Sequence, residues 1–149
     1  MDQIKPVEVL LIEDNAADVR LIREALRESK IFLNLNVLDS GGDVMDYLRR
    51  KGDYTLASRP GLILLDLNLP KKDGRQVLSE IKSDVDLKHI PIVVLTTSAS
   101  EVDILGSYRD HVNCYITKPV DFNQFCEIVK KISDFWFTIV KLPNSPSNP

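Results

Sequence analysis

The segment GLILLDLNLP, residues 61–70, decides the fold of this chain. Its aliphatic run has no polar interruption, as a strand buried on both faces requires, and Asp66 follows the run directly. A second run of this kind, residues 9–12, is followed by Glu13 and Asp14. If the two strands lie side by side, their ends gather these carboxylates into one small pocket at the rim of a sheet.

Carboxylates gathered in this way repel one another, and each raises the pKa of its neighbours unless a cation neutralises the charge. A site made only of oxygen atoms suits a hard cation such as Mg²⁺ or Ca²⁺ better than zinc. The sequence therefore predicts a divalent metal ion held beside an exposed aspartate, Asp66.

Apolar runs and helical patterns alternate along the chain, which is the order of a β/α fold with a mostly parallel sheet. The predicted strands are residues 9–12, 33–38, 62–65, 92–95 and 114–117. The predicted helices are residues 16–29, 42–51, 74–83, one opening at the capping box 98–101, and one opening at 121–124. Right-handed crossovers then place these helices on both faces of a doubly wound sheet, with ligands at the carboxyl ends of the strands.

Length and composition indicate one globular domain. The chain has 149 residues, of which 44% are hydrophobic and 28% charged, so it can bury a core of ordinary size. We expect residues 1–142 to form this domain and the Pro-, Ser- and Asn-rich residues 143–149 to be a disordered tail.

Charge and hydropathy exclude several classes of function. The net charge of −3 gives no basic excess for binding nucleic acid. No apolar run approaches the roughly 18 residues of a membrane span, and the N-terminus has no apolar signal segment, so we expect a cytoplasmic protein. The two cysteines, Cys114 and Cys126, lack the spacing of a zinc site or redox pair.

Two further polar residues fall at the same edge of the predicted sheet. Thr96 follows the fourth predicted strand and Lys118 follows the fifth, so a hydroxyl and an ammonium face the carboxylates. This combination suits phosphoryl transfer: Asp66 is the candidate nucleophile, and Mg²⁺ on Asp14 and Asp66 neutralises phosphoryl oxygens. Lys118 and the Thr96 hydroxyl bind the remaining oxygens.

Taken together, these motifs resemble the receiver domains of two-component response regulators, of which the bacterial chemotaxis regulator is the best-studied example. The resemblance covers residues 7 to about 135. It rests on Glu13-Asp14, Asp66-Leu67-Asn68-Leu69-Pro70, Asp73-Gly74, Pro91 to Thr96, and Lys118-Pro119, a pair usually joined by a cis peptide in that family.

The resemblance implies a flavodoxin-like sheet of order 2-1-3-4-5 and a phosphoacceptor at Asp66. It also implies that the Asn68 main-chain carbonyl is a third protein ligand to Mg²⁺, and that Glu13 reaches the metal through water. Tyr115 matches the switch aromatic, whose rotamer follows the switch hydroxyl. Thr97 stands where many receivers have alanine, and its larger side chain is expected to narrow access to the phosphoryl group.

Within the family, the chain is most similar to the small single-domain receivers that accompany cyanobacterial phytochrome kinases. The partner implied is therefore a phytochrome-type histidine kinase, and the role implied is that of a signalling protein rather than an enzyme with an external substrate. The cues are Asn15-Ala16-Ala17-Asp18, the long connection 54–60, His89-Ile90-Pro91, and residues 134–143.

Two other functions use similar residues. A phosphatase of the haloacid dehalogenase type also combines Asp, Mg²⁺, a hydroxyl and a lysine, but usually carries an acid/base aspartate two positions after the nucleophile. Asn68 occupies that position here and cannot transfer the proton. The other alternative is a pseudo-receiver, a binding module without phosphorylation, which the full set of acidic, hydroxyl and lysine positions disfavours.

The predicted last helix, residues 121–141, carries a long apolar stripe. At 1.5 Å per residue it would be roughly 31 Å long, whereas strands usually span only about 17–20 Å. Its final turns are then expected to extend past the domain and to pair with a second copy, although they could instead fold back over their own domain. The residues proposed for the homodimer interface are Phe135, Trp136 and Ile139.

Overall fold

The computed structural model describes residues 6–97 and 114–131. Its strands are β1 (Val7–Ile12), β2 (Leu33–Leu38), β3 (Leu62–Asp66), β4 (Ile92–Thr96) and β5 (Cys114–Thr117). They form one sheet in the order β2-β1-β3-β4-β5, and every pair of neighbours is parallel. The predicted doubly wound sheet and its strand order are confirmed.

Helices connect the strands at most of the predicted places. They are α1 (Ala16–Glu28), α2 (Val44–Arg49), α3 (Gly74–Ser83) and a helix over residues 122–131, with short 3-10 turns η1 (Gly41–Asp43) and η2 (Gly52–Tyr54). The predicted helix opening at 98–101 lies outside the described residues, as do the proposed interface residues Phe135, Trp136 and Ile139. No helix in the described part of the chain is long and apolar enough to cross a bilayer.

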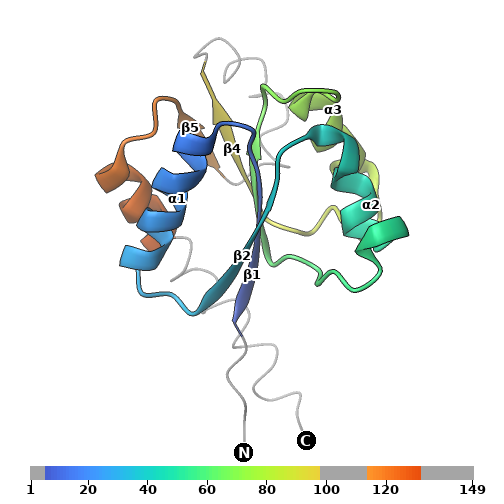
Figure 1. The fold of residues 1–149 in the computed structure, drawn as a ribbon, viewed down its shortest axis with the longest axis horizontal. Coiled ribbons are helices and arrows are strands. Elements are labelled where there is room, and N and C mark those ends of the chain that lie inside the picture. Colours follow the sequence, from blue (N-terminus) through green and yellow to red (C-terminus); the bar gives the residue numbers. More distant parts are fainter. Residues whose placement is uncertain (1–5, 98–113, 132–149) are drawn as a thin grey trace, which may run out of the picture.

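Two apolar layers hold the helices against the sheet. Figure 1 shows α1 and helix 122–131 on one face, and α2 and α3 on the other. Because side chains alternate along a strand, β1 sends Leu11 to the first layer, with Ile22 and Phe125, and Leu10 to the second, with Val77. Both faces of β3 and β4 are buried, which explains their unbroken aliphatic sequences.

The strand register brings the polar strand ends to one edge of the sheet. Ile12 pairs with Leu65 and Asp66 pairs with Leu95, so Glu13 and Asp66 follow neighbouring positions. Backbone hydrogen bonds continue past the strands, and Lys118 N donates to the Thr96 carbonyl at 2.7 Å. The Lys118–Pro119 peptide is cis, as the resemblance implied.

Helix α3 begins directly against the end of β3. Gly74 N donates to the Leu67 carbonyl at 3.1 Å. A Cβ atom at Gly74 would lie 2.4 Å from the Asp66 carbonyl oxygen and 2.6 Å from Leu67 Cα, which no side chain can tolerate without movement. The Asp73-Gly74 turn therefore packs α3 tightly behind the loop that follows Asp66.

Candidate functional site

Three carboxylates meet at the carboxyl edge of the sheet, as the sequence predicted. One oxygen each from Glu13, Asp14 and Asp66 lies within 4.8 Å of the others. Glu13 and Asp66 are 1% and 2% exposed, whereas Asp14 is exposed. Two buried acids and one exposed acid therefore bring their oxygen donors together at this edge of the sheet.

The prediction that Asp66 is itself exposed is wrong. One of its oxygens, Oδ1, accepts a hydrogen bond from Asn68 N at 2.9 Å, and the other, Oδ2, lies 3.2 Å from Lys118 Nζ. The loop that follows β3 and the Lys118 side chain therefore both contact the carboxylate at the end of a fully buried strand. Apolar periodicity carries no information about either contact.

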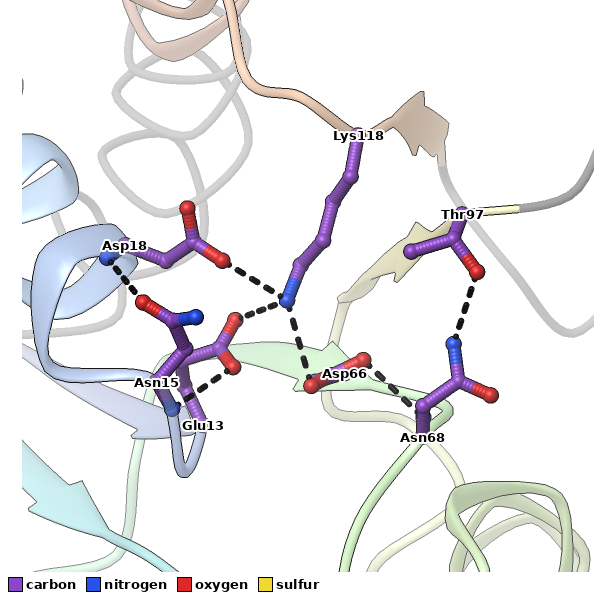
Figure 2. Close-up of polar contacts among 7 residues, drawn as sticks. All are labelled: Glu13, Asn15, Asp18, Asp66, Asn68, Thr97 and Lys118. Atoms are coloured by element: carbon purple, nitrogen blue, oxygen red, sulfur yellow. Dashed lines mark hydrogen bonds and ion pairs between the residues drawn. The ribbon is translucent and has the colours of Figure 1, made fainter.

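The Lys118 ammonium lies among three carboxylates from three elements (Figure 2). Its Nζ is 2.6 Å from Glu13 Oε1, 3.0 Å from Asp18 Oδ2 and 3.2 Å from Asp66 Oδ2. Burial opposes the charged ammonium, but the close ion pairs with Glu13 and Asp18 and the charge of Asp66 outweigh burial. The pKa of Lys118 is therefore raised above its ordinary value, and the side chain stays a cation.

Burial and a neighbouring acid both oppose the negative charge on Glu13. Burial first, and then its hydrogen bond and charge interaction with Asp66, raise the pKa of Glu13 to about 7, although Lys118 acts in the opposite direction. Its Oε2 accepts from Asn15 N at 3.2 Å. Its buried Oε1, although close to Lys118, is not aligned with any hydrogen-bond donor among the described residues.

These residues fit a hard divalent cation. The Lys118 ammonium contacts three carboxylates, those of Glu13, Asp18 and Asp66, and Asp14 lies next to them. The negative charge of these side chains therefore exceeds the positive charge of the lysine. The donors are all oxygen atoms, and one buried oxygen lacks an aligned donor. Carboxylate clusters of this kind suit Mg²⁺, Mn²⁺ or Ca²⁺ rather than zinc.

The predicted hydroxyl and aromatic positions lie on the two strands next to β3 on this side of the sheet, β4 and β5. Thr96 is fully buried at the end of β4, and the exposed Thr97 accepts a hydrogen bond from Asn68 Nδ2 at 3.1 Å (Figure 2). Tyr115 is half-buried on β5 and packs against the apolar layer beneath α2 and α3. The roles of Thr96 and Tyr115 in switching, and of the Asn68 carbonyl as a metal ligand, stay predictions.

Sequence reasoning did not identify Asp18 as a member of the site. It lies in the first turn of α1, where its backbone N donates to the capping Asn15 side chain at 3.0 Å. This cap turns the first helical residues toward the strand end, so the Asp18 carboxylate reaches Lys118. An acidic residue one turn into a helix that follows an acidic strand end is the signal that would have identified it.

The comparison with known families gives one match along most of the chain. A family described as the response regulator receiver domain matches residues 9–130. The response regulator Rcp1 of Synechocystis sp. is 51% identical over 138 residues, which cover 93% of this chain and 94% of Rcp1.

Solved structures show the same similarity. The crystal structure of the phosphorylated cyanobacterial phytochrome response regulator RcpA has a TM-score of 0.77 and 55% identity, covering 91% of this chain and 96% of its own. The Mn²⁺-bound form of Rcp1 has a TM-score of 0.76 and 51% identity, covering 88% of this chain and 94% of its own.

Proposed function

Because the chain belongs to the family of response regulator receiver domains, we propose that it is a signalling switch phosphorylated on Asp66 by a histidine kinase. The observation that carries this proposal is the position of Asp66 at the end of β3. Its carboxylate lies between the Lys118 ammonium and the oxygens of Glu13 and Asp14. The Lys118 ammonium on one side, and a cation held by Glu13 and Asp14 on the other, would keep the nucleophile negatively charged and would stabilise the product.

The proposed reaction moves a phosphoryl group from a phosphohistidine to Asp66. A carboxylate oxygen of Asp66 attacks the phosphorus, a P–O bond forms, and the P–N bond breaks with its electron pair retained by the imidazole nitrogen. Lys118 already lies 3.2 Å from Asp66, so its ammonium is within reach of the incoming phosphoryl oxygens. The Thr96 hydroxyl, one strand away, binds another of these oxygens.

We propose Mg²⁺ as the resident cation. Asp14, Asp66 and the Asn68 main-chain carbonyl would hold it directly, and Glu13 would hold it through water. When bound, the cation neutralises negative charge on the phosphoryl oxygens. The acidic cluster and the Mn²⁺-bound form of the similar Rcp1 support a divalent ion at this position.

Phosphorylation is proposed to act through Thr96 and Tyr115. The added charge draws the Thr96 hydroxyl toward the phosphoryl group, and Tyr115 turns inward into the space that this movement leaves. We propose that Thr97, which accepts a hydrogen bond from Asn68, narrows the approach to Asp66. The surface that changes includes β5, where partner proteins would distinguish the two states.

The proposed donor is a phytochrome-type histidine kinase, because the similar RcpA is a cyanobacterial phytochrome response regulator. The chain would catalyse only its own phosphorylation and dephosphorylation. A pseudo-receiver is disfavoured because Asp14, Asp66, Thr96 and Lys118 all lie at the same edge of the sheet.

Intact-mass spectrometry after incubation with acetyl phosphate and Mg²⁺ tests the proposal. The parent protein should gain one phosphoryl group and Asp66→Asn none. Asp73→Asn is the matched control, because Asp73 is an exposed carboxylate near the site and asparagine caps a helix as well as aspartate does. Undiminished incorporation in Asp66→Asn would exclude Asp66 as the acceptor.

A further inference from the structure

The sheet carries a second polar site at the end opposite Asp66. Along β1 and β2, Glu8, Asn34 and Asn36 lie on the same face as Leu10, because residues two apart share a face of a strand. A sheet face covered by a helix is normally apolar. Here the part of that face beside α2 is polar at three adjacent positions.

These side chains line a cavity of about 550 Å³. This volume lies within the range of small-ligand sites, which is about 300–1,000 Å³. Among the described residues, its wall has two carboxylates and two phenol rings, and no lysine or arginine. Its polar lining residues include Glu8, Asn34, Asn36, Tyr47, Asp53 and Tyr54.

The Glu8 carboxylate is held in place by neutral groups. Asn34 Nδ2 donates to Glu8 Oε2 at 2.8 Å and Asn36 Nδ2 donates to Oε1 at 3.4 Å. No lysine or arginine within the described ranges forms an ion pair with Glu8. A carboxylate offers about four acceptor positions, so capacity remains for a charged donor.

Tyr47 supplies a second, independent observation. Its side chain lines the cavity and is only 8% exposed, yet its hydroxyl forms no hydrogen bond with any residue that the structure describes. Burial, followed by the charge of Glu8 and by Tyr54, raises the pKa of Tyr47, so the phenol stays neutral. Its ring centroid lies 5.4 Å from that of Tyr54, so aromatic surface adjoins the carboxylate.

We propose that this cavity binds an organic cation, a guanidinium or primary ammonium group on an aliphatic stem. The carboxylates, which have no ion-pair partner among the described residues, attract the cation. Its N–H groups donate hydrogen bonds to Glu8 and to the Tyr47 hydroxyl, and the flat face of a guanidinium stacks on the tyrosine rings. At the rim, Leu56 is 96% exposed and offers apolar surface for the stem.

The proposed ligand site is separate in space from Asp66. Glu8 lies on β1 and Glu13 follows that strand five residues later, which corresponds to roughly 16 Å along the strand direction. The ligand is either a small free molecule or an arginine side chain of a partner protein, since both present the same cationic group.

Titration of the ¹⁵N-labelled protein, followed by NMR, tests the proposal with three probes. They are agmatine, the blocked peptide Gly-Arg-Gly, and the same peptide with citrulline, a neutral isostere of arginine. We expect saturable shifts at the amides of Leu35 and Tyr54 with a cationic probe and none with the citrulline peptide. Tighter binding of agmatine would indicate a free small molecule, and equal or tighter binding of the arginine peptide would indicate a protein partner.

Variants distinguish binding of the cation at this site from non-specific attraction of a cation to an acidic protein. Glu8→Gln should weaken binding at least about tenfold while keeping an acceptor for the asparagines. Tyr47→Phe should weaken binding severalfold without loss of fold, because its hydroxyl has no partner among the described residues. Glu28→Gln, which removes an exposed charge on α1, should bind the cationic probes as the parent does.

Three outcomes would overturn the proposal: no saturable shifts with a cationic probe, equal binding of the citrulline peptide, or unchanged affinity in a folded Glu8→Gln variant.

Discussion

At the scale of single residues, the site concentrates negative charge that the fold alone does not neutralise. Glu13 is 1% exposed and its pKa is raised to about 7, first by burial and then by Asp66, while Lys118 is shared among three acids. Such a cluster costs stability when no metal is bound. We therefore expect this carboxylate cluster to serve cation binding rather than folding stability.

Glu13→Gln should therefore stabilise the protein in buffer with a chelator. We expect a gain of about 1 kcal/mol at pH 8, because the variant removes one of several repelling charges but keeps the oxygen that accepts from Asn15. Urea unfolding with EDTA and with Mg²⁺ measures the effect, and the gain should shrink in Mg²⁺. A loss of stability in EDTA would show that Glu13 is well compensated by Lys118.

Asp18 should contribute to cation affinity at a distance. It neutralises part of the Lys118 charge at 3.0 Å, so Asp18→Asn leaves the ammonium more repulsive toward a nearby divalent ion. We expect Asp18→Asn to weaken Mg²⁺ binding about threefold. Asp14→Asn should weaken it at least about tenfold, because that variant removes a proposed direct ligand. Calorimetric titration compares the two variants. Equal losses of Mg²⁺ affinity in the two variants would contradict a direct role for Asp14 and an indirect role for Asp18. Unchanged affinity in both variants would mean that the metal binds elsewhere.

At the scale of secondary-structure elements, the contact between α3 and the end of β3 fixes the loop that follows Asp66. Gly74→Ala should destabilise the protein by at least about 2 kcal/mol, because its Cβ would overlap backbone atoms of Asp66 and Leu67 that cannot rotate away. Phosphorylation should also slow as the loop moves.

Ser79→Ala, on the exposed face of α3, is the control and should change the unfolding free energy by less than about 0.5 kcal/mol. Chemical denaturation of both variants measures the difference. Equal stability of Gly74→Ala and the parent would mean that α3 shifts freely against β3.

The elements were predictable where a local pattern determines them, and the contacts between them were not. The unbroken aliphatic runs identified β3 and β4, and Asn15 marked the start of α1. The burial of Asp66 and the Asp18–Lys118 ion pair depend on side chains that approach each other from distant parts of the chain. The polar face of β2 was visible as alternation in LNLNVL, but its meaning depends on Glu8 in the neighbouring strand.

At the scale of the whole molecule, we predict a homodimer. Helix 122–131 buries Phe125 and Val129 against α1 and the sheet, and the sequence continues the apolar stripe toward Trp136. Truncation after Ser133 should weaken the dimer without unfolding the sheet, because Phe125 and Val129 are retained. Sedimentation equilibrium at tens of micromolar measures this, and a strict monomer with and without an aspartyl-phosphate mimic would contradict it.

The most direct test of the central claim is to identify the phosphorylated residue chemically. The protein is phosphorylated in Mg²⁺, treated with borohydride, which reduces an acyl phosphate to an alcohol, and sequenced by tandem mass spectrometry. We predict homoserine at position 66 in phosphorylated samples alone. Homoserine at Asp14 or at another acidic position, with Asp66 unmodified in a phosphorylated sample, would contradict the assignment.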